Sequence, residues 1–127
     1  MPIVEVEIVL RPGESLEGGL AHELANQTGL VFGTPPGRTW VMVRALPSEQ
    51  YAENGGGPPP EVSPVFVSVL KARLPPPDRL AMEAAELTRA LAAACRRPPE
   101  NVHVLYLPEA AGRVSFGGRL LSSSLGP

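Results

Sequence analysis

The sequence lacks cysteine pairs, long apolar runs and a strong excess of charge, and each absence excludes a class of protein. A single cysteine, Cys95, allows neither a disulfide framework nor a cysteine-rich metal site. No apolar run approaches the ~20 residues of a transmembrane helix, and Glu5 and Glu7 interrupt the apolar stretch that a signal peptide would need. The formal net charge of -2 provides no basic surface for nucleic acid or for an acidic membrane. We therefore expect a cytoplasmic protein that binds neither.

Sequence motifs for nucleotides and metal ions are also missing. The chain contains no phosphate-binding glycine loop, no His-Glu-x-x-His and no Cys-x-x-Cys. We therefore expect no metal site, and we expect any catalysis to proceed without a cofactor.

Proline and glycine are abundant, with 16 and 13 residues in a chain of 127. They gather at residues 35–36, 55–60, 75–77 and 98–99, and the segments between these clusters are strongly patterned. The clusters therefore mark the boundaries of elements in a folded chain. The length predicts a single domain, residues 1–127.

The first half of the chain predicts a strand, a helix and a second strand. Apolar residues alternate with glutamates over residues 3–10, which is typical of a half-buried strand. Leucines spaced by four predict a helix over residues 15–28, with Ser15 as its N-cap and Gly29 as its C-cap. Residues 39–46 form the next apolar strand.

The second half repeats this order. Residues 65–73 predict a strand, and residues 78–96 predict an amphipathic helix that Asp78 caps. Residues 101–107 predict the last strand. We expect repeat one to span residues 1–54 and repeat two to span residues 64–127, with a Gly/Pro linker at residues 55–63 between them.

Matching residues support the duplication. Pro64 follows Pro2 at the same spacing as Arg73 follows Arg11. Two β-α-β repeats predict an α+β fold, in which a four-stranded mixed sheet carries two helices on one face and each crossover joins parallel strands. The other face stays partly apolar, so we expect copies of the chain to associate through it.

The order of these segments resembles the tautomerase superfamily. A strand that begins with Pro2, directly after the initiator methionine, and a duplicated β-α-β unit are typical of its fused two-repeat members. Residues 101–109 and 111–120 resemble the second strand and terminal hairpin of 4-oxalocrotonate tautomerase. Residues 40–43 and 46–55 resemble cis-3-chloroacrylic acid dehalogenase. The superfamily also includes macrophage migration inhibitory factor, and its fused members are trimers, so the resemblance implies a homotrimer.

Pro2 is the candidate catalytic residue. Removal of Met1 would leave a secondary amine at the chain terminus, and an α-amino group titrates at ~8. Burial and nearby cations lower that pKa further, which produces a neutral base near pH 7. The alternative interpretation is that Pro2 only begins an edge strand. The nitrogen of Pro64 is an amide and cannot be a base, so one site per protomer is expected.

One arginine ends the first strand of each repeat, Arg11 in repeat one and Arg73 in repeat two. The resemblance implies that an arginine at this place binds the carboxylate of the substrate. Arg11 and Arg73 both lie one position short of the family arginine, and the second repeat's Arg73 is expected to face Pro2. The alternative for either residue is a solvated strand end.

Three further residues are candidates through the resemblance. His103 stands where relatives place an arginine or tyrosine that reaches a neighbour's proline, and it can hydrogen-bond a substrate oxygen. Phe116 is a candidate wall of the pocket, and Glu53 matches a catalytic glutamate of the dehalogenase, so it is a candidate acid. The alternatives are a strand histidine bonded to backbone, core packing by Phe116, and a Glu53 that lies at the degenerate Pro64 position instead of the Pro2 site.

The resemblance implies a cofactor-free tautomerase that acts on small 2-hydroxy-enoate or 2-oxo acids, with a small carboxylate as its substrate. One alternative is a non-catalytic trimeric scaffold of the same fold, with Met1 retained. A second alternative is a hydrolytic relative in which Pro2 stays protonated and an acid such as Glu53 activates water.

Overall fold

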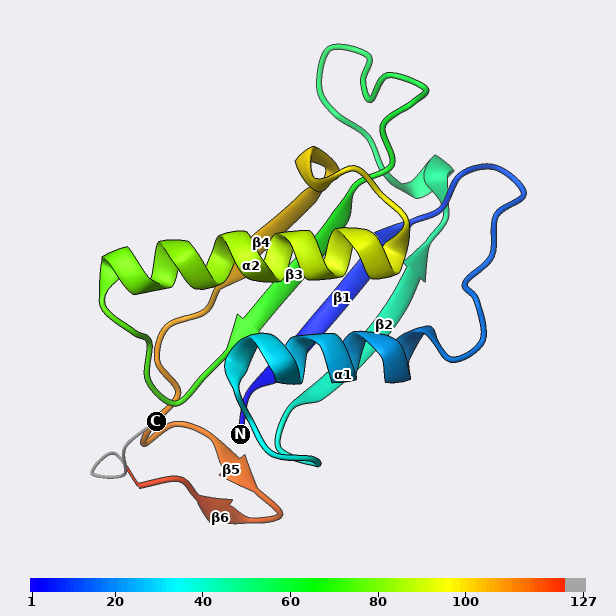
Figure 1. Ribbon diagram of the computed structural model, residues 1–127. Helices are drawn as coiled ribbons and strands as arrows, with labels where there is room; N and C mark the ends of the chain where they lie inside the picture. Colours follow the sequence, from blue (N-terminus) through cyan, green and yellow to red (C-terminus); the bar gives the residue numbers. More distant parts are fainter. Residues whose placement is uncertain (123–127) are drawn as a thin grey trace.

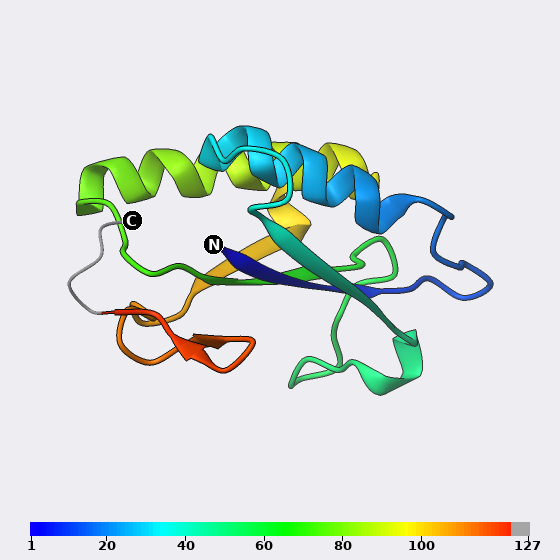
Figure 2. The same ribbon diagram turned by 90° about the horizontal axis from the view of Figure 1, so that it is seen from below.

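The computed structural model describes residues 1–122 and has two layers (Figure 1). One layer is a four-stranded sheet of β1 (Ile3–Val9), β2 (Trp40–Leu46), β3 (Val65–Leu70) and β4 (Val102–Tyr106). The other layer contains α1 (Leu20–Phe32) and α2 (Pro77–Cys95). Figure 2 views the sheet nearly edge-on and shows both helices on the same face. The predicted α+β fold, with a mixed sheet and two helices on one face, is therefore confirmed.

The strand order places the two repeats back to back. The order is β2-β1-β3-β4, with β1 parallel to β2 and β3 parallel to β4. The central strands β1 and β3 are antiparallel, and Ile3 lies opposite Leu70. This register brings the start of β1, and with it Pro2, beside the turn that follows β3.

The core lies between the sheet and the helices. Alternate residues of the central strands point toward the helices and are buried, for example Val6 and Val67. They pack with buried leucines of both helices, namely Leu24, Leu87 and Leu91. Burial of one such side chain stabilises the fold by about 1.5–3 kcal/mol, so this strand periodicity fixes which face of the sheet meets the helices.

The other face of the sheet is largely open and partly apolar. Met42 and Leu105 lie on this face and are 47% and 60% exposed. A hairpin of β5 (Ser115–Phe116) and β6 (Arg119–Leu120) lies beneath one end of the face (Figure 2). There the Phe116 ring meets the Trp40 ring edge-on, with their centroids 5.4 Å apart.

The predicted bounds of the first helix were wrong. The helix begins at Leu20, because Gly19 adopts a positive φ of 82° that ends the preceding loop. Ser15 therefore lies outside the helix and does not cap it. At the other end the helix continues through Gly29 and ends at Gly33, whose left-handed conformation terminates it.

Two smaller predictions were also wrong. Asp78 lies in the first turn of α2, but it does not cap the helix, because Pro76 occupies the N-cap position without a side-chain hydrogen bond. The predicted first strands of both repeats end too late. β1 ends at Val9 and β3 ends at Leu70, so Arg11 and Arg73 lie in the turns that follow these strands.

Short 3-10 turns, η1 (Ser48–Gln50) and η2 (Pro99–Asn101), complete the described elements. The linker predicted at residues 55–63 lies between η1 and β3, in a loop that projects from one end of the sheet (Figure 1). Within residues 1–122, neither helix combines the length and the apolar character needed to cross a membrane.

Candidate active site

A cavity of about 460 Å³ opens beside Pro2, at the start of β1. Its walls come from the end of α1, from the loop between α1 and β2, and from the turn after β3. The lining residues are Met1, Pro2, residues 32–35, Arg38 and residues 71–73. This volume lies within the range of small-molecule sites.

The backbone holds Pro2 as a continuation of β1. Pro2 is buried, and its carbonyl oxygen accepts a hydrogen bond from the Trp40 N–H at 3.0 Å. The next residue, Ile3, already pairs with strands on both sides. The position of the proline ring is therefore set by the sheet, and Met1 lines the cavity beside it.

The cavity is lined by cations. Arg38, Lys71 and Arg73 contribute to its wall, and among residues 1–122 no Asp or Glu does. Arg73 has a distant acidic partner, because its Nη1 lies 4.0 Å from Oε1 of Glu109. Since the whole chain carries a formal net charge of -2, this concentration of positive side chains is local. Such a cavity favours an anion.

The ammonium group of Lys71 is held by a carboxylate outside the cavity wall. Its Nζ donates to Oε1 of Glu83 on α2 at 2.8 Å, and it lies 4.5 Å from the centroid of the Phe32 ring. Tyr106 on β4 donates its hydroxyl to the other oxygen of Glu83, also at 2.8 Å. Burial, followed by the bond to Glu83, raises the pKa of Tyr106 far above its ordinary value of 10.0, so the hydroxyl keeps its proton.

Arg73 is the predicted substrate-binding residue that the structure places beside Pro2. Arg11 lies beyond the opposite end of β1, separated from Pro2 by seven strand residues, which is about 23 Å at ~3.3 Å per residue. Its guanidinium instead pairs with Glu14 at 3.7 Å. Within one protomer, Arg11 and Pro2 therefore belong to different ends of the molecule.

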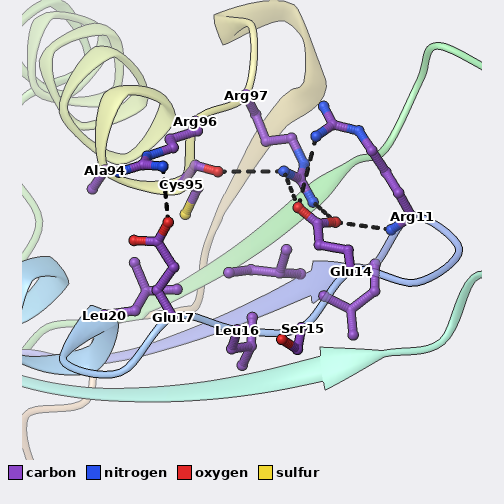
Figure 3. Close-up of a pocket in the computed structure, with 12 residues that line it drawn as sticks. Arg11, Glu14, Ser15, Leu16, Glu17, Leu20, Ala94, Cys95, Arg96 and Arg97 are labelled. Carbon is purple, nitrogen blue, oxygen red and sulfur yellow. Dashed lines mark hydrogen bonds and ion pairs between the residues drawn. The ribbon is translucent and has the colours of Figure 1, made fainter.

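The hollow near Arg11 contains a second group of charges (Figure 3). The side chain of Arg97 is only 2% exposed, and its two terminal nitrogens donate to the two carboxylate oxygens of Glu14 at 2.8 and 3.1 Å. Arg97 also donates to the carbonyl oxygens of Val9 and Ser63. Here each positive charge has a nearby partner. Through its hydrogen bonds, Arg97 connects the loop after α2 with the end of β1, with the segment before β3 and with the loop that contains Glu14.

Burial alone would raise the pKa of Glu14. The hydrogen bonds from the Arg97 side chain and the Arg11 backbone outweigh that effect and hold the pKa below its ordinary value of 4.5. Glu14 therefore stays ionised around neutral pH.

Neither Lys71 nor Arg97 was identified from the sequence. Only the strand register, which places Lys71 one step beyond the Ile3–Leu70 pair, could have pointed to the lysine.

No protein-family model and no curated protein sequence matches the chain. Solved structures do match it. A structure of Pt0534 inactivated by 2-oxo-3-pentynoate aligns with a TM-score of 0.75 and 16% identity, over 98% of this chain and 99% of that one. Macrophage migration inhibitory factor from Oncomelania hupensis aligns with a TM-score of 0.70 and 22% identity, over 98% and 85% of the two chains.

A third structure, a wild-type symmetric trimer of fused 4-OT, aligns with a TM-score of 0.70 and 13% identity, over 95% of each chain. The chain has the tautomerase-superfamily fold. At these identities the likeness establishes the fold alone. It agrees with the predicted order of the elements and with the four-stranded mixed sheet.

The other candidates lie away from the Pro2 cavity of this tautomerase-superfamily fold. His103 is exposed on the open face of the sheet, with its ring centroid 5.6 Å from that of Phe66. Phe116 lies on the hairpin against Trp40. Glu53 accepts a hydrogen bond from the Tyr51 hydroxyl at 2.7 Å, between η1 and the Gly/Pro linker. None of the three lines the Pro2 cavity, although Phe116 contacts Trp40, whose N–H bonds the carbonyl oxygen of Pro2.

Proposed function

We propose that the chain, after removal of Met1, is a cofactor-free tautomerase of small 2-hydroxy-enoate or 2-oxo acids. One observation carries the proposal: Pro2, Arg73 and two further cations line the same cavity, and no acid of the described residues lines it with them. Pt0534, which shares the fold, is inactivated by 2-oxo-3-pentynoate, itself a 2-oxo acid. That finding supports the same substrate class here.

The proposed reaction is a proton transfer. The neutral nitrogen of Pro2 takes the proton of the 2-hydroxyl group, the electron pair moves through the conjugated system, and Pro2-H⁺ returns the proton to carbon. The product is the 2-oxo acid, and no atoms are gained or lost. Arg73 binds the carboxylate with its planar guanidinium, and the positive wall stabilises the negative charge that develops on the oxygen.

Removal of Met1 has two effects in this proposal. It converts the nitrogen of Pro2 from an amide without a basic lone pair into a secondary amine. It also removes a side chain from the cavity wall, including a thioether whose Sδ lies 3.8 Å from Nη1 of Arg38. Both effects favour the approach of a substrate to the nitrogen.

The proposed assembly is a homotrimer. Fused 4-OT, with the same fold, forms a symmetric trimer, and the open sheet face of this chain exposes Met42, Phe66 and Leu105. Association through this face would bury apolar surface and bring His103 or Phe116 toward a neighbour's cavity. Both residues remain candidates for substrate contact in that setting.

Kinetics of Met1-free protein with phenylenolpyruvate or 2-hydroxymuconate test the proposal. Pro2→Ala keeps a primary amine but loses the rigid ring, so kcat/KM should fall by about 10²–10⁴-fold. Pro64→Ala changes the equivalent proline of the second repeat, whose nitrogen is an amide, and should leave the chemistry unchanged in folded protein. An unaltered rate for Pro2→Ala would overturn the proposal.

The pH profile separates this reaction from the hydrolytic alternative. A base requires the neutral amine, so activity should rise with pH through the pKa of Pro2. A hydratase-like enzyme in which Pro2 stays protonated would instead lose activity as the amine deprotonates. The position of Glu53 outside the Pro2 cavity removes the local support for that alternative within one protomer.

A further inference from the structure

Lys71 connects the Pro2 cavity with the helix layer, because it lines the cavity and pairs with Glu83 of α2. On one side it lines the cavity with Pro2 and Phe32. On the other side it contacts Glu83, which lines a separate hollow of about 260 Å³ between the end of α1 and α2. The ion pair is largely enclosed, because the side chains of Lys71 and Glu83 are only 16% and 14% exposed.

An enclosed ion pair acts on its neighbours differently from a surface pair. Solvent screens exposed charges strongly, whereas groups of low exposure interact through a lower effective dielectric constant. The ammonium group of Lys71 disfavours protonation of a nearby amine, and the carboxylate of Glu83 offsets part of that effect. The balance between the two charges therefore bears on the proton affinity of Pro2.

We propose that Lys71 lowers the proton affinity of the Pro2 amine, and that Glu83 is a positioning residue that holds Lys71 in place and sets how much of its charge Pro2 experiences. The inference rests on the proposed function, because it assigns these residues a purpose only if Pro2 is a base. Tyr106 supports the arrangement by donating to the oxygen of Glu83 that Lys71 does not use.

Other charges face the same amine. The α1–β2 loop contributes Arg38, and the turn after β3 contributes Arg73, whose guanidinium lies near Glu109. These two arginines also lower the proton affinity of Pro2. Lys71 differs from Arg73 because its counter-ion Glu83 is closer, at 2.8 Å against 4.0 Å, and is largely enclosed on α2, an element that contributes no residue to the cavity wall.

The two charges of the pair predict shifts of opposite sign. Lys71→Met removes the cation and leaves Glu83, so the pKa of Pro2 should rise by about one pH unit. Glu83→Gln leaves an uncompensated ammonium, so the pKa of Pro2 should fall by about half a unit. Lys71→Arg keeps the charge and should restore the value of the unmodified protein. A purely structural role would not produce shifts of opposite sign.

The experiment titrates the terminal amine of Met1-free protein directly, by the ¹⁵N resonance of Pro2 in proline-labelled protein. The matched control is Glu86→Gln, which removes an exposed carboxylate one turn further along α2 and should leave the pKa of Pro2 unchanged. The pH profile of kcat/KM, where activity is present, should move by the same amounts as the resonance. Thermal unfolding of each variant verifies that it is folded, and Lys71→Met and Lys71→Arg test the inference without Glu83→Gln.

Two outcomes would overturn the inference. One is that Lys71→Met and Glu83→Gln shift the pKa of Pro2 in the same direction. The other is that Glu86→Gln shifts this pKa as much as Glu83→Gln does. Opposite shifts in a protein without tautomerase activity would support the charge balance and refute the proposed function. Tautomerase activity together with an unchanged pKa of Pro2 in these variants would support the proposed function and refute the charge balance.

Discussion

Charged side chains are used differently at the two ends of β1. At the Pro2 end, Arg38, Lys71 and Arg73 line a cavity that no acid of the described residues lines with them. At the other end, Arg97 is enclosed and pairs with Glu14 through two hydrogen bonds. The first arrangement suits an anion that enters from solvent, and the second ties the loop after α2 to the end of β1.

At the scale of residues, the neighbourhood of Pro2 and Arg73 could be predicted from the sequence, because both follow from the duplication. Their approach was expected from the fold of the repeats, and the cavity contains both. Lys71 and Arg97 could not be predicted, because a charge beside a Pro-rich turn is usually solvated. Only the packing of α2 against the sheet shows that Lys71 is paired with Glu83.

The two arginines differ in their expected effect on substrate binding. Arg73→Ala should raise KM for a carboxylate substrate by the loss of about 1.5–3 kcal/mol, because Arg73 lines the Pro2 cavity. Arg11→Ala should have a smaller effect, because Arg11 lies beyond the other end of β1. Steady-state kinetics of both variants test this difference. Equal and small effects would show that neither arginine lines the site.

Glu14 predicts a pH-dependent stability. Its pKa in the folded chain lies below the ordinary value of 4.5, so its contribution is fully present above that value and is lost as pH falls through the lowered pKa. Glu14→Gln should reduce the free energy of unfolding by about 2–3 kcal/mol at pH 7, since it leaves Arg97 buried without its counter-ion.

Thermal unfolding between pH 7 and about pH 3 measures the effect. The two proteins should become similar in stability at the acid end. Glu17→Gln is the control, because Glu17 and its partner Arg96 are both mostly exposed, and it should change stability little. A difference between Glu14→Gln and the unmodified chain that persists at low pH would contradict the assignment.

At the scale of elements, the strands and α2 were located within a few residues because their apolar periodicity is continuous. The first helix was displaced toward the amino terminus because Leu16 extends the spacing of Leu20 and Leu24, so periodicity alone includes the preceding loop. Leu16 is in fact packed against the core from outside the helix. The backbone of Gly19 and Gly33, rather than the leucine spacing, determines where α1 begins and ends.

Gly29, inside α1, and Gly33, its C-cap, provide a test of this boundary. Gly29 lies within the helix, and a Cβ there would meet only Thr34 Oγ1 at 3.5 Å, so Gly29→Ala should stabilise the chain by about 0.5–1 kcal/mol. Gly33 has a positive φ of 69°, so Gly33→Ala should destabilise it by about 1 kcal/mol. Chemical denaturation measures both. Destabilisation by Gly29→Ala would instead agree with a C-cap at that residue.

At the scale of the whole molecule, the duplication in the sequence accounts for the sheet. Each repeat supplies one parallel pair of strands, and the antiparallel contact between β1 and β3 joins the two pairs. Both helices then cover the same face, which leaves the other face dependent on a partner for burial. The sequence pattern predicts that face but not which residues of a neighbouring chain would meet it.

The proposed homotrimer would have a mass of about 40 kDa, since one chain has a mass of 13.4 kDa. Leu105→Asp places a charge on the open face of the sheet and should shift the protein toward monomer. Met82→Asp makes the same change on the outer side of α2, where Met82 is also exposed, and should leave assembly intact. Light scattering of the three proteins tests this. A mass near 13 kDa for the unmodified chain would refute the proposed trimer.

The proposed function requires the nitrogen of Pro2 to be the catalytic base, and Met1 controls whether that nitrogen is an amine or an amide. The decisive measurement compares the tautomerisation rate of two preparations of the same chain, one without Met1 and one that retains it, each verified by intact mass. The Met1-free protein should convert phenylenolpyruvate or 2-hydroxymuconate, and 3-bromopropiolate should label its first peptide alone. The Met1-bearing protein should be inactive, because an acylated nitrogen cannot accept the proton. Full activity of the Met1-bearing protein would show that the nitrogen of Pro2 is not the catalytic base.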